Sequence, residues 1–337
     1  MSISSFNDLQ LESKRINHNT CISCILVDEH KIYVGGLDGN IKIWTLGESE
    51  PEGTLKGHKD LINAMVMLKD KSLLSASDDG CLIHWDLKSN IGTIKLLGHE
   101  KSVTCCSVIY NRRLSSGFNI ERGFTIVSGS WDQTIRVWDI AKQRALRILK
   151  GHSAPIKSVV HFENEGQITF VSAAQNGEIF TWDLMSLAPI QKIRPYTRNV
   201  NKLVVRNETI ISSGHDNKIK VWNKDLTASN DLETRTSNVR KFIVFRENWL
   251  VALCGTKSVE VWNLQNKKMI QKKDFDECLM DIVSLDEKRI LLATRKEGLV
   301  FKYVNKPLVL MNLLHRFRKD MNYPPIVVKQ LFESILE

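Results

Sequence analysis

Histidine, serine and aspartate recur along this 337-residue chain at spacings that could support nucleophilic hydrolysis. In one stretch His58 is followed by Ser75 and Ser77, then by Asp79 and Trp85. A serine activated by a histidine that an aspartate orients is the triad of many hydrolases. The pattern returns along the chain, as His18, Asp38 and Trp44 and as His99, Asp132 and Trp138. A catalytic site would occur once, so the recurrence favours a structural role.

No other motif predicts an enzyme. The chain has no GxxxxGK[ST], GxSxG or HExxH motif, and Gly35, Gly36 and Gly39 are turn glycines beside Asp38. We therefore expect no catalytic residues and no cofactor.

Cys21 and Cys24 form a CxxC pair, which in other contexts binds zinc or is redox-active. The segment from residue 21 to 27 is typical of a strand, where residues three apart point to opposite faces. The two thiols would then diverge, and we expect no metal site. The seven cysteines, an odd number without disulfide-like spacing, indicate reduced thiols in the cytoplasm or nucleus.

Composition excludes several classes of protein. Hydrophobic residues make up 42% and charged residues 25%, which is ordinary for a globular chain. No stretch reaches the roughly 18 apolar residues of a membrane helix, and the first 19 residues do not resemble a signal peptide. We expect no membrane association.

An aromatic residue returns at intervals of 41, 53, 44, 40, 40 and 41 residues, each time in a run rich in Ile, Val and Leu. The series is Trp44, Trp85, Trp138, Trp182, Trp222, Trp262 and Tyr303. Six residues before each lies a second marker, in order Asp38, Asp79, Asp132, Asn176, Asp216, Thr256 and Glu297. A histidine precedes the first four units, at His18, His58, His99 and His152. Repeats of this length, made of short alternating strands, predict stacked β-sheet units.

These repeats resemble the WD-repeat (WD40) β-propeller family over residues 9 to 305. The resemblance implies an all-β fold, a seven-bladed propeller of four-stranded antiparallel blades. It also implies a structural tetrad in each complete unit, in which the histidine bonds the Asp-position residue. That residue holds a strand serine and the loop, and the Trp indole N–H ends the chain of hydrogen bonds. For the second unit that serine is Ser75 or Ser77. The predicted tetrad residues are His18, Asp38, Trp44, His58, Asp79, Trp85, His99, Asp132, Trp138, His152, Asn176 and Trp182.

The first residues resemble the strand that leads into the fourth unit, so we expect an N-terminal strand to complete the last blade. The propeller would then span residues 1–305, with a basic insertion at about 110–123 in the third blade. Residues 306–337 show helical spacing and predict an amphipathic helical tail. Its apolar face comprises Leu310, Leu314, Phe317, Leu331, Phe332 and Ile335. The tail would pack on the propeller or dock into another protein, and it is loosely similar to a SOCS box.

In WD-repeat proteins the usual contact surface is the narrow face around the central channel. The matching positions lie directly before the tetrad Asp, and three and five residues after the His. From them we predict a partner-binding set of Leu37, Leu61, Trp131, Lys157, Asn201, His215, Arg240 and Lys296. Trp131 is the expected anchor, because aromatic residues dominate binding hot spots. Together, the apolar and basic residues suit a peptide with an apolar segment and acidic flanks.

The sequence therefore predicts a non-enzymatic scaffold or adaptor, monomeric within a multiprotein complex, that binds a protein or peptide on the narrow face. The formal charge of +9 and a pI of about 9.1 leave open a ribonucleoprotein or chromatin subunit that contacts nucleic acid. The tail leaves open a substrate receptor of a ubiquitin ligase.

Overall fold

The computed structural model describes residues 8–17, 20–46, 48, 50–110, 124–164, 167–183, 188–206, 209–235, 238–245, 248–286, 289–295 and 297–304. His18, Lys296, residues 111–123 of the insertion and the whole tail lie outside the described residues. The tail residues Leu310, Leu314, Phe317, Leu331, Phe332 and Ile335 are among them. The division at residue 305 and the helical tail therefore stay predictions.

The described strands form seven four-stranded antiparallel sheets, which we number as blades in chain order. Blade 1 consists of β2 (Ile22–Asp28), β3 (Lys31–Gly36), β4 (Ile41–Thr45) and β5 (Gly53–Leu55). Blade 2 consists of β6 (Ile62–Met67), β7 (Leu73–Ser77), β8 (Leu82–Asp86) and β9 (Ile91–Leu96). Blade 3 consists of β10 (Val103–Tyr110), β11 (Phe124–Ser130), β12 (Ile135–Asp139) and β13 (Arg144–Leu149). Blade 4 consists of β14 (Ile156–Asn164), β15 (Gln167–Ala174), β16 (Ile179–Asp183) and β17 (Pro189–Ile193). Blade 5 consists of β18 (Val200–Arg206), β19 (Thr209–Gly214), β20 (Lys218–Trp222) and β21 (Ser229–Glu233). Blade 6 consists of β22 (Val239–Phe245), β23 (Trp249–Cys254), β24 (Ser258–Asn263) and β25 (Lys268–Asp274). Blade 7 combines β26 (Leu279–Ser284), β27 (Arg289–Thr294) and β28 (Glu297–Val304) with β1 (Asp8–Asn17).

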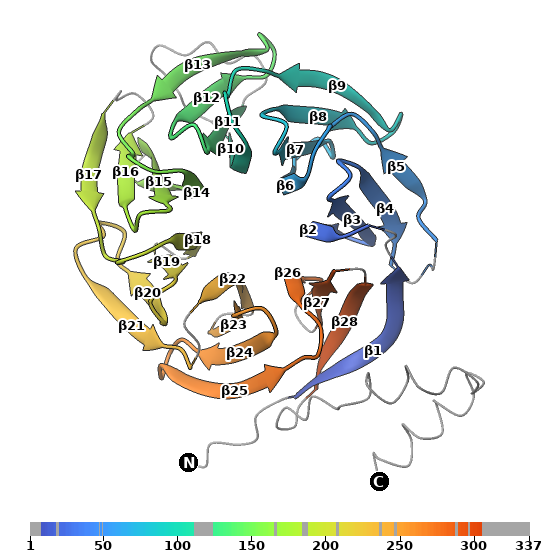
Figure 1. Cartoon of the computed structure of the whole chain (residues 1–337), viewed down its shortest axis with the longest axis vertical. Coiled ribbons are helices and arrows are strands. Elements are labelled where there is room, and N and C mark those ends of the chain that lie inside the picture. Colours follow the sequence, from blue (N-terminus) through green and yellow to red (C-terminus); the bar gives the residue numbers. More distant parts are fainter. Residues whose placement is uncertain are drawn as a thin grey trace.

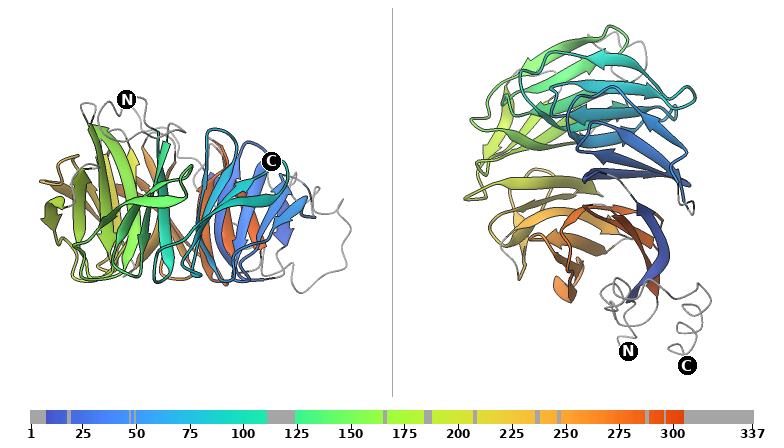
Figure 2. Two further views of the ribbon diagram at one scale, coloured as in Figure 1. Left: turned by 90° about the horizontal axis from the view of Figure 1, so that it is seen from above. Right: turned by 45° about the vertical axis from the view of Figure 1, so that its right-hand side comes forward.

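The blades stand side by side in a ring (Figures 1 and 2). The innermost strands are β2, β6, β10, β14, β18, β22 and β26. The predicted all-β propeller is confirmed, and no helix occurs among the described residues. In particular, that part of the chain holds no helix of the length and apolarity needed to cross a membrane.

The hydrophobic core lies between neighbouring blades, since a single sheet cannot cover both of its own faces. One cluster joins Tyr33 and Ile43 of blade 1 to Ile62 and Trp85 of blade 2, and each is at most 4% exposed. Glycine permits the closest approach between blades 3 and 4. A Cβ atom at Gly129 would lie 2.5 Å from Cγ2 of Ile156.

The N-terminal strand completes the last blade, as the sequence indicated. Strand β1 pairs antiparallel with β28, from Asp8 opposite Val304 to Asn17 opposite Glu297, with one irregularity between Glu12 and Arg15. It is the outer strand of blade 7, whose order is β1-β28-β27-β26. The ring is thus closed by strands from opposite ends of the described chain.

Candidate functional site

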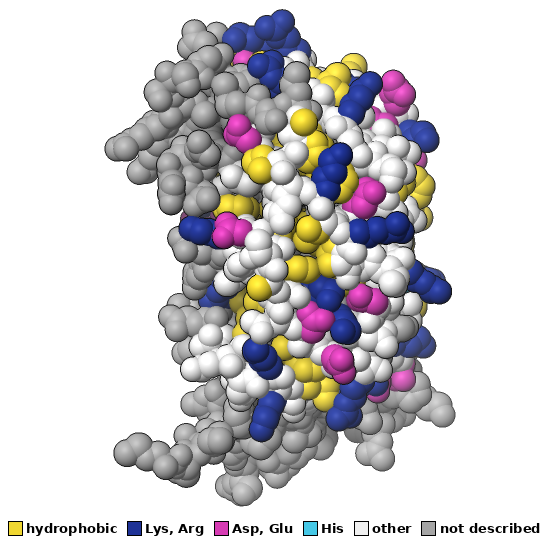
Figure 3. Space-filling view, turned by 90° about the vertical axis from the view of Figure 1, so that its left-hand side faces the viewer, with side chains coloured by type: hydrophobic (Ala, Val, Ile, Leu, Met, Phe, Trp, Pro, Cys, Tyr) yellow, Lys and Arg dark blue, Asp and Glu magenta, His cyan; other side chains and the backbone are white. Residues whose placement is uncertain are grey.

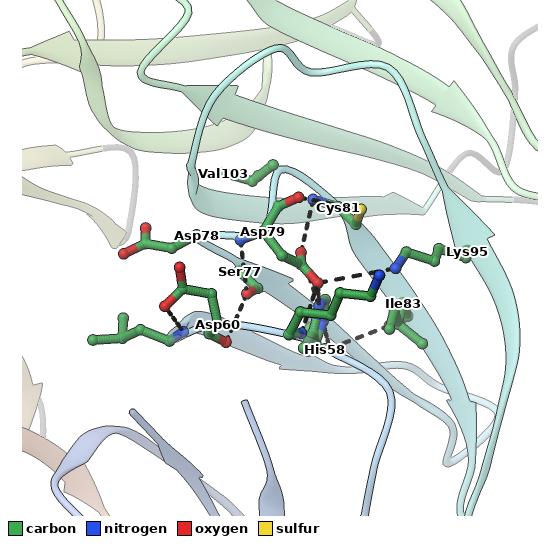
Figure 4. Close-up of polar contacts among 12 residues, drawn as sticks. His58, Asp60, Ser77, Asp78, Asp79, Cys81, Ile83, Lys95 and Val103 are labelled. Carbon is green, nitrogen blue, oxygen red and sulfur yellow. Dashed lines mark hydrogen bonds and ion pairs between the residues drawn. The ribbon is translucent and has the colours of Figure 1, made fainter. Parts of the chain in front are cut away.

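The His-Ser-Asp-Trp set of blade 2 forms one closed hydrogen-bond network, and Figure 4 shows its His58–Asp79 part. His58 Nδ1 lies 3.1 and 3.0 Å from the two carboxylate oxygens of Asp79, and His58 Nε2 lies 2.7 Å from Ser75 Oγ. The Trp85 indole N–H donates to the same Oγ at 2.8 Å. Ser75, and not Ser77, is therefore the tetrad serine. It bonds His58, so the expectation that Asp79 holds the serine is wrong. Ser77 Oγ instead donates to the carbonyl of Asp60 at 2.9 Å.

Asp79 is held as a carboxylate. Burial alone would raise its pKa, but the hydrogen bond and charge of His58 and the backbone N–H groups of Lys59 and Cys81 outweigh burial and hold the pKa well below its usual range. Ser75 is completely buried, and its Oγ already has two partners. The network therefore fastens the loop before β6 to the β7–β8 turn, and it has no room for a substrate.

Blade 3 repeats the network. His99 Nδ1 lies 2.8 Å from Asp132 Oδ2, and His99 Nε2 lies 2.8 Å from Ser128 Oγ. The Trp138 indole N–H donates to Ser128 at 2.8 Å. As in blade 2, burial opposes ionisation of Asp132, but its hydrogen bonds with His99 and Thr134 hold its pKa well below the usual range.

In blade 4 the predicted role of Asn176 is wrong. His152 Nδ1 instead lies 3.1 Å from Glu178 Oε2, while its Nε2 reaches Ser172, to which Trp182 donates at 2.8 Å. Asn176 donates to Ser153 Oγ at 2.8 Å. Glu178 is two residues further on, and its longer side chain brings a carboxylate to the imidazole that an uncharged amide cannot match.

Blades 1, 5 and 6 have other contacts in place of the His–Asp–Ser–Trp network. In blade 5 the Tyr196 hydroxyl takes the place of the imidazole, 2.8 Å from Ser212 Oγ, which also accepts from Trp222. In blade 6 the indole of Trp262 donates to the buried carboxylate of Glu260 at 3.3 Å. In blade 1 Asp38 is exposed and accepts from Asn40, and Trp44 is fully buried. A serine ten residues before the Trp, at Ser75, Ser128, Ser172 and Ser212, was the sequence signal for the serine position.

A β-bulge at the start of the innermost strand is common to all seven described sheets. The register shifts across one residue in each, namely Ser23, Asn63, Thr104, Lys157, Asn201, Arg240 and Met280. A bulge turns the extra residue out of the ladder and re-aims its side chain. These seven positions, which we call the bulge residues, are the ones that lie five residues after the tetrad His or its equivalent.

At five of the seven junctions between described sheets, the bulge residue donates to a backbone carbonyl at the start of the next innermost strand. The bonds run from Ser23 to Ile62 (2.6 Å), Asn63 to Val103 (3.0 Å), Thr104 to Ile156 (2.6 Å), Asn201 to Val239 (2.9 Å) and Arg240 to Leu279 (2.9 Å). Asn201 and Arg240 were predicted to bind a partner, but each donates a hydrogen bond to the neighbouring blade. The sequence could not show this, because the bond depends on the bulge and on the spacing of the blades.

The other two junctions carry a bond of the opposite polarity. Where the bulge residue is Lys157 or Met280, the residue after it accepts from a backbone N–H of the next blade. Ser158 Oγ accepts from Leu203 at 3.0 Å, and Asp281 Oδ2 accepts from Ile25 at 2.9 Å. Every junction of the described ring is therefore tied by a side chain of its innermost strand.

Lys157 is consequently available for another role. Its Nζ lies 5.2 Å from the ring centroid of Trp131, within the range of a cation–π contact. Burial lowers the pKa of Lys157, and the charge of Asp78 partly restores it. Burial, followed by the charges of Arg198 and Lys157, lowers the pKa of His215. Three residues of the predicted set are thus linked, since Lys157 lies over Trp131 and acts electrostatically on His215.

Trp131 lies on a turn that is fixed by a hydrogen bond from its backbone N–H to the carbonyl of Ser102, at 2.9 Å. Its side chain is 42% exposed. Leu37 is 53% exposed on the equivalent turn of blade 1, where its N–H donates to Cys21 at 3.0 Å. Leu61 is half-buried. The two turns therefore present large apolar side chains on backbone that is held by hydrogen bonds. Among the described residues no group of His, Cys, Asp and Glu is arranged to hold a metal.

A family model described as "WD domain, G-beta repeat" matches residues 11–45, 49–86 and 90–139. An uncharacterized WD repeat-containing protein of Schizosaccharomyces pombe is 25% identical over 69% of this chain and 62% of its own length. A ribosome biogenesis protein, the WDR12 homolog of Drosophila mojavensis, is 26% identical over 63% of this chain and 52% of its own length. The kinesin-like protein KIF21B of Homo sapiens is 21% identical over 77% of this chain but only 17% of its own length. The matches thus span less than two thirds of each of these relatives.

Proposed function

Because this chain is a WD-repeat protein, we propose that it is a non-enzymatic interaction scaffold that binds a protein or peptide segment on the narrow face. The observation that supports this most is the exposed indole of Trp131 on a turn fixed by a backbone hydrogen bond. An anchor held in place before binding loses little conformational entropy when a partner arrives. The proposed setting is a multiprotein complex in the cytoplasm or nucleus.

The chemistry of the face suits an apolar segment with an acidic flank. Leu37 and Trp131 supply apolar area, and Lys157 stands over the indole. Lys157 and Arg198 both act electrostatically on His215 and provide positive charge near blades 4 and 5. Asp78 of blade 2 accepts from Asn63 at 2.7 Å and lies within electrostatic reach of Lys157. A carboxylate of the partner would therefore favour the side near blades 4 and 5.

Substitution Trp131→Ala in the full chain tests this function. We expect partners captured by the native protein to bind at least about tenfold more weakly to the variant, because buried aromatic anchors dominate hot spots. The matched control is Ile190→Ala, since Ile190 is 64% exposed on the outer strand β17, away from the narrow face. Quantitative affinity purification provides the measurement. Equal recovery of every partner with the native chain and both variants would contradict the proposal.

A ribonucleoprotein role is the second candidate, supported by the similarity to a protein named for ribosome biogenesis and by the charge of +9. On the side of the molecule that Figure 3 shows, basic side chains are dispersed with acidic ones between them, which argues against a dense nucleic-acid-binding patch there. The ubiquitin-ligase alternative depends on residues 306–337 and stays a prediction.

If the protein contacts RNA directly, its affinity for a single-stranded RNA should fall steeply with salt. The logarithm of the binding constant is expected to fall with the logarithm of salt concentration, with a slope of about −0.7 for each phosphate neutralised. A filter-binding titration from low to physiological salt measures this slope. Absence of binding at low salt would exclude direct RNA contact.

A further inference from the structure

Arg136, two residues before the tetrad Trp of blade 3, has a buried donor without an acceptor. Its Nε is shielded from solvent and makes no hydrogen bond. The guanidinium lies over the Trp138 ring, 5.8 Å from the centroid, and within the described part of the chain it makes no hydrogen bond or ion pair. The carboxylates of Asp132 and Asp139 in the same blade are engaged by His99 and by backbone N–H groups, respectively. A buried N–H without an acceptor is unfavourable, so this position lacks an acidic group.

Blade 5 has the acidic group that blade 3 lacks. Lys220 holds the equivalent position, two residues before the tetrad Trp, and it lies opposite Asp231 of the outer strand β21. The Lys220 ammonium is 2.8 Å from the Asp231 carboxylate. Arg136 instead lies opposite Ile148 of the outer strand β13. Directly opposed residues place their side chains on the same face of a sheet, so blade 3 has an isoleucine where blade 5 has a counterion.

Two exposed apolar side chains lie beside the Arg136 guanidinium. Ile148 is 44% exposed, and Leu97, which follows directly after β9, is 63% exposed. Leu97 precedes Gly98, where a Cβ atom would lie only 2.5 Å from Nη1 of Arg136, so the missing side chain makes room for the guanidinium. Strands β9 and β13 are the neighbouring outer strands of blades 2 and 3 (Figure 1). Leu97, Arg136 and Ile148, which we call the rim patch, thus combine apolar area with an unpaired charge.

The packing of the blade does not require a charge at this position. Blades 2 and 4 have Ile83 and Phe180 there. Phe180 stacks on His152, with 4.1 Å between ring centroids, and Ile83 lies against Gly57, where a Cβ atom would be 3.3 Å from its Cδ1. An apolar side chain therefore fills the position without leaving a donor unpaired. Arg136 departs from these blades in a way that the fold itself does not explain.

We propose that the rim patch is a second docking surface, which binds a segment of a partner protein that carries Asp or Glu next to an apolar residue. The partner's carboxylate accepts from the guanidinium of Arg136, as the outer-strand carboxylate of blade 5 does from its lysine. The apolar residue covers Leu97 and Ile148. Arginine is suited to this role because its planar fork matches a carboxylate, and it is enriched at protein interfaces. The patch does not include Trp131, so it is independent of the site proposed on the narrow face.

Selection from a library of random short peptides displayed on phage tests the rim patch. The bait is the full chain with Trp131→Ala, which lacks the anchor proposed for the narrow face. Peptides that also bind the same chain with Arg136→Met are removed. The remaining peptides should be enriched in Asp or Glu next to Leu, Ile or Phe. The proposal is wrong if no peptide distinguishes the two chains, or if the retained peptides lack a carboxylate.

Fluorescence anisotropy with one selected peptide and the otherwise native full chain measures the contribution of each residue. Arg136→Met should weaken binding at least about tenfold, as expected for an arginine hot spot. Ile148→Asp should weaken it similarly, because the new carboxylate would pair with Arg136 as in blade 5. The matched control Arg144→Met removes a charge from an exposed position of β13 and should bind like the native chain. An unchanged affinity of Arg136→Met, or an equal loss with Arg144→Met, would overturn the proposal.

Thermal unfolding separates docking from a structural role of Arg136. The variant Arg136→Met should melt no earlier than the native chain, because Ile83 and Phe180 fill the same position in blades 2 and 4. A lower melting temperature together with unchanged peptide affinity would identify a purely structural arginine and contradict the proposal. Light scattering tests a different occupant. A dimer of the native chain that Arg136→Met dissociates would assign the rim patch to a second copy and would also overturn the proposal.

Discussion

Deletion of residues 1–17 is expected to abolish soluble folding of the propeller. The deletion removes β1, the outer strand of blade 7, and leaves β28 with an unpaired edge along its length. Exposed strand edges pair with other chains and promote aggregation. The yield of soluble protein and the melting temperature of any soluble fraction measure the effect.

A shorter deletion, of residues 1–7 only, is the control because it leaves β1 intact. This variant should remain soluble and unfold within a few degrees of the native chain. A melting temperature unchanged by the longer deletion would show that blade 7 is stable without its fourth strand.

Substitution Asp79→Asn should lower the free energy of unfolding by roughly 3 kcal/mol, because it removes the charged acceptor of several hydrogen bonds, each of which contributes about 1.5–3 kcal/mol. The amide retains the size of the side chain but loses the carboxylate that His58 and two backbone N–H groups bind. Urea denaturation at pH 7 measures the change. Asn176→Ala is the matched control, since Asn176 holds the same sequence position in blade 4 without contacting His152, and it should cost less than about 1 kcal/mol.

The effect of Asp79→Asn should depend on pH. The pKa of Asp79 is lower in the folded protein than the usual value, so its ionisation stabilises the fold above about pH 4, the unfolded pKa. That contribution is lost as the pH falls towards the folded pKa. The stability gap between the native chain and Asp79→Asn should therefore be widest at neutral pH and narrow below pH 4. A gap that is constant from pH 7 to pH 3 would mean that charge does not contribute.

The repeat markers predicted the architecture because they are local. A Trp in an apolar strand and an Asp in the preceding turn fix the register of one unit, and the strand of residues 8–17 could be matched to an outer strand from its pattern alone. The networks of blades 2 and 3 were implied by the resemblance of these repeats to WD-repeat proteins. The serine of blade 2 stayed open between Ser75 and Ser77, since the choice depends on which face of β7 meets His58.

The parts that sequence could not predict depend on contacts between units. Glu178 replaces Asn176 because of side-chain reach, which spacing does not encode. Asn201 and Arg240 resembled partner-binding residues, but the bulge directs them to the next blade.

The pairing of β1 with β28 also sets an order of events during synthesis. Asp8 emerges from the ribosome 296 residues before Val304, its partner in the sheet. Six blades can be assembled from neighbouring segments while β1 waits without a partner, so the most distant contact in the described chain forms last. Contacts of high sequence separation are slow to form and leave strand edges open in the meantime. The closure that protects the finished ring therefore leaves the nascent chain dependent on its final strand.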